Sequence, residues 1–259
     1  MRIKQSAVAG IFYPDNADEL ALIVSQLLAK NPQQGCMPVA IQVPHAGLIY
    51  SGGIAARAYN RIRRYLNSIS RIVILGPAHR VPLQGMAVMD AGLWQTPLGQ
   101  VQLDNVLTDA LISEGRVSVN DMAHAQEHCL EVQLPFLQVL DGECRVLPVL
   151  VGQTPLSSVS ALIGRVLKEP GVLVVISSDL SHFHSYSEAN LIDRATLQQI
   201  SSLNAEITPQ QACGCYALNG LLAYASDHGL KAENLGYCNS GDTAGDKSSV
   251  VGYSSYAFY

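Results

Sequence analysis

The chain has 259 residues, of which 48% are hydrophobic and only 14% are charged, and its formal net charge is -5. This composition predicts a large buried core beneath a thinly charged surface. Nucleic acid is excluded as a first expectation, because the densest basic cluster, residues 61–64, falls in a predicted helix, where a solvent-exposed face is the better interpretation. No apolar run approaches the roughly 20 residues of a membrane span, so we expect a cytoplasmic protein with no membrane partner.

Predicted helices and strands alternate along the chain. Helical spacing and capping residues predict helices at 17–30, 51–66, 104–111, 127–140, 156–167, 188–202 and 209–228. Apolar runs predict strands at 38–43, 72–75, 86–89, 144–151, 172–176, 235–238 and 250–258, with loops at 94–99 and 240–247. The alternation continues without a linker-like stretch. We therefore expect one three-layer α/β/α domain with a central mixed sheet over residues 1–259.

Three of the predicted strands lead into histidines. The strand at 38–43 is followed by His45, the strand at 72–75 by His79, and the strand at 172–176 by Asp179 and His182. Ligand sites of open α/β sheets lie at the carboxyl ends of strands, so one shared site is expected. Neutral imidazole is the commonest metal ligand. Three histidines suit zinc with one open position, and two histidines with an anionic ligand suit non-haem iron.

Acidic residues near these histidines permit more than one interpretation. Asp179 either orients an imidazole, with His182 as a proton carrier, or caps the helix that follows. Glu127 and Glu131 lie four residues apart in a mostly apolar predicted helix, with His128 beside Glu127. We interpret them as a polar edge that faces the pocket.

The six cysteines are scattered, which argues against a disulfide scaffold. Cys213 and Cys215 fall in a predicted helix, and residues two apart cannot share one helical face. The residues alone therefore favour two buried thiols, with a single thiolate ligand as the alternative.

A family resemblance adds to this pattern. Six motifs in chain order resemble the MEMO family, which includes the AmmeMemoRadiSam system protein B: Pro-His-Ala-Gly at 44–47, Gly-Pro-Ala-His at 76–79, Glu-His-Cys-Leu-Glu at 127–131, Pro-Val-Leu-Val-Gly at 148–152, Ser-Ser-Asp-Leu-Ser-His at 177–182 and Cys-Gly at 213–214. The match runs from residue 9 to the C-terminus. The family is similar in fold to class III extradiol dioxygenases, which use non-haem iron.

The resemblance implies a metal site of two histidines and a cysteine, which the motifs place at His45, His79 and Cys213. It makes His182, with Asp179 beside it, the catalytic pair of the pocket. Glu127 and His128 are then expected to contact substrate or the metal ligands. The third ligand in dioxygenases of this fold is a glutamate, so this chain departs from them at the cysteine, and ring cleavage does not follow from the resemblance.

Three functions stay open. The first is a dioxygenase-like oxidoreductase in which iron(II) binds oxygen and a small-molecule substrate. The second is a metal-binding protein without turnover, in which a soft thiolate favours copper or zinc. The resemblance implies AMMECR1-like and radical-SAM proteins as its partners. The third, least favoured, is a hydrolase that uses Cys213 and His182, because this would require a metal-free thiolate.

Overall fold

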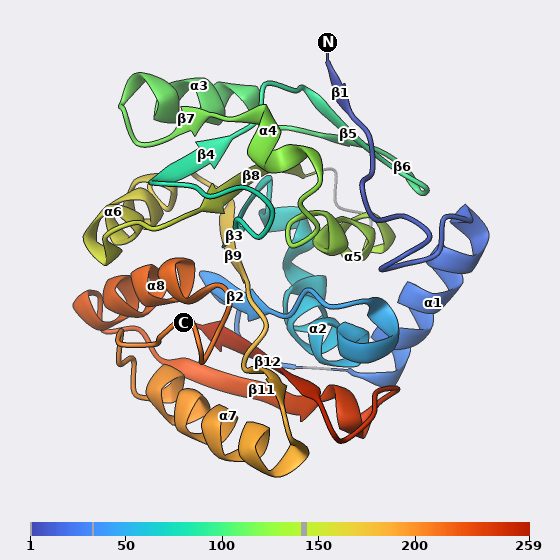
Figure 1. Cartoon of the computed structure of the whole chain (residues 1–259). Coiled ribbons are helices and arrows are strands. Elements are labelled where there is room, and N and C mark those ends of the chain that lie inside the picture. Colours follow the sequence, from blue (N-terminus) through green and yellow to red (C-terminus); the bar gives the residue numbers. More distant parts are fainter. Residues whose placement is uncertain (1, 33, 141–143) are drawn as a thin grey trace.

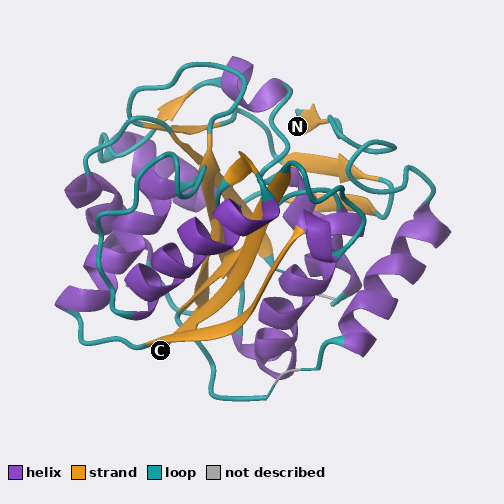
Figure 2. Cartoon of the chain, turned by 60° about the horizontal axis from the view of Figure 1, so that its bottom comes forward, coloured by secondary structure: helices purple, strands orange, loops and turns teal. Residues whose placement is uncertain are grey.

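A computed structural model describes residues 2–32, 34–140 and 144–259, with helices on both sides of a central sheet (Figures 1 and 2). The strands are β1 (Ile3–Lys4), β2 (Ala40–Val43), β3 (Arg71–Pro77), β4 (Met86–Val88), β5 (Leu93–Thr96), β6 (Gly99–Gln102), β7 (Ser118–Val119), β8 (Arg145–Val151), β9 (Val172–Ser177), β10 (His182–His184), β11 (Ala232–Asn239) and β12 (Val250–Phe258). The α-helices are α1 (Ala17–Lys30), α2 (Leu48–Ile62), α3 (Asn105–Ser113), α4 (Asp121–Ala125), α5 (Leu134–Val139), α6 (Leu156–Val166), α7 (Tyr186–Ser201) and α8 (Cys215–Asp227). Three short 3-10 helices are η1 (Arg63–Ser68), η2 (Glu131–Gln133) and η3 (Ser240–Asp242). None of the helices in these ranges combines the length and the apolar character that a bilayer crossing demands.

The main sheet is mixed, as predicted. Its strand order is β10-β12-β2-β9-β3-β8-β4-β7, with β11 paired to the remaining edge of β12. The central strands β2, β9, β3 and β8 are parallel, whereas β12 and β4 pair antiparallel on either side of them. The parallel strands are buried along nearly their whole length, as expected when helices cover both faces of a sheet. A smaller sheet has the order β1-β5-β6.

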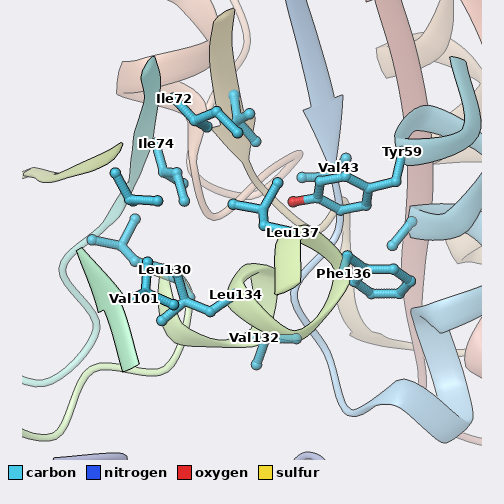
Figure 3. Close-up of a cluster of buried hydrophobic side chains, with 14 of the residues drawn as sticks. Val43, Tyr59, Ile72, Ile74, Val101, Leu130, Val132, Leu134, Phe136 and Leu137 are labelled. Atoms are coloured by element: carbon cyan, nitrogen blue, oxygen red, sulfur yellow. The ribbon is translucent and has the colours of Figure 1, made fainter. Parts of the chain in front are cut away.

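Alternate residues of one strand build the two halves of the core. Ile72 and Ile74 of β3 pack in the cluster that contains the buried residues of α1, α2 and α5. Val73 and Leu75 pack in the opposite cluster, with α6 and α8. Successive side chains of a strand point to opposite faces, so one apolar run serves both layers. Figure 3 shows the first cluster where Leu137 of α5 lies near Ile72, Ile74 and Val43. The three-layer α/β/α prediction is confirmed.

The helix predicted at 127–140 is wrong in its first half. Helix α4 ends at Ala125, and α5 begins only at Leu134, with η2 between them. Pro135 lies in the first turn of α5, where its missing N–H leaves no helical hydrogen bond unmade. The proline therefore begins this helix and does not interrupt an earlier one. Residues 126–130 form a connection that reaches the edge of the sheet.

Two further predictions fail where a turn was misjudged. Residues 94–99 form most of a hairpin, in which β5 pairs antiparallel with β6 and Thr96 lies opposite Gly99. The Pro and Gly that predicted a loop belong to the turn and the start of the second strand. The last predicted helix begins at Cys215, not at Pro209, with Gly214 as its N-cap residue. Cys213 therefore precedes the helix.

The basic cluster is only partly solvent-exposed. Arg61 is 4% exposed, and its guanidinium donates hydrogen bonds to both carboxylate oxygens of Glu233, at 2.9 and 2.7 Å. This ion pair fastens α2 to the start of β11. The prediction of a solvent-exposed face holds for Arg63 and Arg64, which are exposed.

Candidate metal centre

Three histidine-bearing segments meet at one edge of the sheet. Strand β9 lies between β2 and β3, and all three run parallel, so their carboxyl ends are neighbours. His45 and His79 follow β2 and β3, and their ring centroids are 5.3 Å apart. The convergence expected from the sequence is therefore present for these two histidines.

His128 is the third member of the cluster. It comes from the connection between α4 and η2, and its ring centroid lies 5.3 Å from that of His45 and 4.8 Å from that of His79. One ligand nitrogen from each of the three rings lies within 4.8 Å of the other two. That spacing lets three imidazoles reach a single ion. Sequence reasoning had placed His128 beside the ligands, on a helix that is not formed there.

Glu127 contacts two of these rings. Its Oε1 accepts a hydrogen bond from Nδ1 of His79 at 2.8 Å and lies 3.2 Å from Nδ1 of His128. The backbone N–H groups of His79 and His128 also donate to this carboxylate, at 2.6 and 2.9 Å. Burial favours the neutral acid, but the contacts with His128 and His79 outweigh it and hold the pKa of Glu127 well below its ordinary range. The side chain is therefore an anion.

His45 is held by a neutral group. Its Nδ1 lies 2.9 Å from Oγ of Ser177, the last residue of β9. Burial, together with the nearby rings of His79 and His128, moves the pKa of His45 well below its ordinary value. The ring is therefore neutral at pH 7, which leaves a nitrogen lone pair available to a metal.

Cys213 reaches the same cluster from the turn before α8. Its Sγ lies 3.3 Å from Nε2 of His45 and accepts a hydrogen bond from the backbone N–H of Asp179 at 3.3 Å. Burial first, and the Asp179 carboxylate second, raise the pKa of the Cys213 thiol. Gly214 allows this approach, because a Cβ there would lie 2.6 Å from Cβ of Ser178. Cys215 is turned into the core and is 2% exposed.

Asp179 and His182 lie on the β9 side of the cluster. Oδ1 of Asp179 accepts a hydrogen bond from the backbone N–H of His45 at 2.7 Å. Burial raises the pKa of Asp179, and the charge of His182 opposes that shift. His182 begins β10, which pairs with β12, and it is partly exposed. Among the described residues, no hydrogen bond joins Asp179 to the His182 ring.

Several contacts of the site were not foreseen. The ring of Phe12 packs on His128, with centroids 4.5 Å apart. Glu131 does not share an edge with Glu127: its carboxylate accepts hydrogen bonds from the backbone of Ala7 and Val8 and from Tyr13 Oη. The spacing of apolar residues gives no sign that Phe12 and Tyr13 contact residues 128–131, which are more than 110 positions away.

Comparison with known proteins identifies the family. A family model described as Memo-like protein matches residues 4–257. This chain belongs to the Memo family. MEMO1 family proteins of Aquifex aeolicus and Methanobrevibacter smithii are 36% and 34% identical to it, and the alignments cover 98% and 99% of this chain and the same shares of those proteins. The Memo resemblance stated from the motifs is thereby confirmed.

A solved structure extends the likeness in fold. The crystal structure of an uncharacterized protein, JW3007, from Escherichia coli K12 aligns with a TM-score of 0.52, covering 85% of the Memo chain and 99% of that chain. The two sequences are 15% identical, so the likeness concerns the fold alone.

Proposed function

We propose that this Memo-family chain binds a redox-active metal ion, iron(II) first and copper as the alternative, through His45, His79 and Cys213. The observation that carries the proposal is the convergence of donors. Three imidazole nitrogens lie within 4.8 Å of one another, and Sγ of Cys213 lies 3.3 Å from one of them. Imidazole and thiolate together suit zinc, copper and iron.

The groups around the rings fit a metal centre. His79 donates from Nδ1 to the Glu127 carboxylate, so its Nε2 carries the lone pair. A carboxylate behind a metal-bound histidine is the usual device that fixes the tautomer and raises ligand basicity. A bound divalent cation would also lower the pKa of Cys213, whose thiol must lose its proton to become a ligand.

The third ligand decides the chemistry. With Cys213 the donor set is two imidazoles and a thiolate, which can hold iron(II), copper or zinc. With His128 it is three imidazoles. We propose Cys213 as the third ligand. His128 is a fourth donor within reach, because one nitrogen of its ring lies within 4.8 Å of one nitrogen each of His45 and His79.

A bound iron or copper ion would supply redox chemistry to a small-molecule substrate, which would make the protein a dioxygenase-like oxidoreductase. The role proposed for the residues of the chain is proton transfer. His182 is the proposed carrier because it is partly exposed and lies three residues beyond Asp179, which contacts His45. The softness of Cys213 favours a second candidate, a metal-handling protein without turnover that acts with AMMECR1-like and radical-SAM proteins.

The test begins with metal analysis of protein purified without oxygen. Titration with Co²⁺ then reports the donors, because a thiolate ligand gives a sulfur-to-cobalt charge-transfer band. We expect Cys213→Ser to abolish this band and weaken binding, while Cys215→Ser, its matched control from the core, keeps both. Retention of the band in Cys213→Ser and its loss in Cys215→Ser would refute the assignment.

Oxygen uptake separates the two candidate functions. Iron-loaded protein is assayed with catechols, and with buffer alone as the control. Substrate-dependent uptake supports the oxidoreductase, and full metal occupancy without any uptake across these probes supports metal handling.

A further inference from the structure

A chain of buried hydrogen bonds runs behind His45. Gln133, in η2, is fully buried, and its Nε2 donates to the carbonyl oxygen of Pro44 at 3.0 Å and to Oγ of Ser177 at 2.9 Å. Its Oε1 accepts from Tyr59 Oη at 2.9 Å. Ser177 Oγ lies 2.9 Å from Nδ1 of His45. Tyr59, Gln133 and Ser177 come from α2, η2 and β9, and none of these three is a proposed ligand.

Two backbone carbonyl groups determine which atom donates in each of these buried hydrogen bonds. The Pro44 oxygen can only accept, so the amide of Gln133 must turn its nitrogen toward it, and that same nitrogen donates to Ser177. The hydroxyl of Ser177 has one proton, which it donates to the carbonyl oxygen of Cys129 at 2.6 Å. Toward the remaining neighbour, His45, the hydroxyl can therefore only accept.

His45 must then donate from Nδ1. A neutral imidazole carries one proton, so Nε2 is left with its lone pair, directed toward the thiol of Cys213 at 3.3 Å. The opposite tautomer also has a partner available, because a proton on Nε2 would point at that sulfur. The choice between the two tautomers consequently depends on what stands behind the ring.

We infer that Gln133 and Ser177 are positioning residues that select the Nδ1–H tautomer of His45 before any metal arrives. The inference rests on the proposed metal centre for its purpose, since the selected tautomer presents an unprotonated nitrogen to the ion. In contrast to the Glu127 contact behind His79, this relay contains only neutral groups.

The tautomer is measured first, in metal-free protein labelled with ¹⁵N, at a pH where His45 is neutral. Two-bond ¹H–¹⁵N correlation spectra distinguish a protonated ring nitrogen from one with a lone pair. We expect wild type to show protonated Nδ1, and Ser177→Ala to move the proton toward Nε2. Zn²⁺ affinity of Ser177→Ala should fall by about 10–100-fold, the range typical of lost partners behind metal ligands.

Ser254→Ala is the matched control. Ser254 is an equally buried serine, and its Oγ donates to the amide oxygen of Gln42 at 3.0 Å, so it also belongs to a buried serine–glutamine pair. We expect this variant to lose stability without any change in the His45 spectrum or in Zn²⁺ affinity. Ser177→Cys, with a weak sulfur acceptor of similar size, replaces Ser177→Ala should the latter fail to fold.

The outcomes separate the inference from the proposed function. An unchanged tautomer in the Ser177 variants overturns the inference, and a changed tautomer with unchanged Zn²⁺ affinity overturns its purpose at the metal centre. Wild-type protein that shows the predicted tautomer but binds no Zn²⁺, Fe²⁺ or Cu⁺ overturns the metal centre, while the selection of the tautomer by Ser177 stands.

Discussion

His45 and His79 follow the two strands that flank β9, yet groups of different charge contact their rings. The serine half of the site is His45 with Ser177, where the holder is a neutral hydroxyl. The glutamate half is His79 and His128 with Glu127, where the holder is an anion. A carboxylate raises the basicity of the imidazole that it holds, whereas a hydroxyl sets its direction without adding charge. In the proposed metal centre, the glutamate half would therefore strengthen binding and the serine half would orient the ligand.

The sharpest test of this division removes the ligands themselves. His45→Ala and His79→Ala should each lose most bound metal, because each removes one of the three proposed ligands and leaves His128 as the sole replacement donor among the described residues. The expected loss exceeds the about 10–100-fold drop that follows from losing a partner behind a ligand. Metal stoichiometry after gel filtration measures it, with His228→Ala, an exposed histidine at the end of α8, as the control. Full occupancy in either ligand variant would contradict the assignment.

The next prediction concerns a residue outside both halves. His182→Ala should retain its metal but lose any turnover by about 10²–10⁴-fold, as expected for a general acid or base. Asp179→Asn should have a milder effect, since the amide oxygen can still accept from the backbone N–H of His45. His184→Ala, two residues further along β10, should change neither quantity. An empty site in His182→Ala would instead make that residue a ligand.

His124, which lies outside the histidine cluster, makes a contribution to stability that depends on pH. His124 is buried with Nε2 3.0 Å from the Ala87 carbonyl oxygen, and burial lowers its pKa from 6.5 to about 4. Between pH 6.5 and about 4, the unfolded chain binds a proton at His124 that the folded chain does not bind. The folded state is therefore most stable, as far as this group is concerned, above pH 6.5, and it loses stability as the pH falls toward 4. The shift corresponds to about 3 kcal/mol.

His124→Gln can donate to the same carbonyl and does not titrate. Urea unfolding of metal-free wild type and variant should therefore diverge from each other as pH falls from 6.5 to 4, with the variant gaining relative stability. Parallel curves over this range would show that His124 becomes protonated without penalty.

The smallest predicted effect compares two buried glutamates. Glu127→Gln should weaken Zn²⁺ binding by up to about 100-fold, nearer the upper end of the usual range than Ser177→Ala, because it removes the charge behind two rings. Glu131→Gln should leave Zn²⁺ affinity unchanged and reduce the free energy of unfolding by about 2–3 kcal/mol through weaker hydrogen bonds to Ala7, Val8 and Tyr13. Equal Zn²⁺ affinities for the two glutamate variants would show that the charge of Glu127 does not support the proposed ligands.

The two histidines that follow strands were the easier part of the site to predict from the sequence. An apolar run that stops at Pro44 predicts the end of a strand, and a β-branched run predicts another before His79. Ligand sites of open α/β sheets lie at the carboxyl ends of strands, so His45 and His79 could be expected together without knowing the strand order. The position of Cys213 could not be predicted from its neighbours in the sequence. It depends on the start of α8 at Cys215 and on the close approach of Gly214 to Ser178. The motifs, not the periodicity, predicted that Cys213 would lie beside the histidines.

The glutamate half was harder because its geometry depends on a connection. Apolar residues at 130–137 have helical spacing, yet the chain forms a 3-10 turn and begins α5 at Leu134. Glu127 accepts backbone hydrogen bonds from His79, 48 residues away, and this contact has no local signature. The role of Gln133 could not be predicted either, because it depends on hydrogen bonds to Pro44 and Ser177, which are distant in the sequence.

The contact between the N-terminal segment and Glu131 has a consequence for biosynthesis. Ala7 and Tyr13 bind a carboxylate that lies 124 and 118 residues further along the chain. At about 5–20 residues per second, a ribosome needs roughly 6–25 s to make the residues between them. During that time the segment that will carry Phe12 to His128 waits for a side chain that has not been synthesised. Contacts of such sequence separation also slow folding after release, so the histidine cluster is expected to be among the last parts of the nascent protein to assemble.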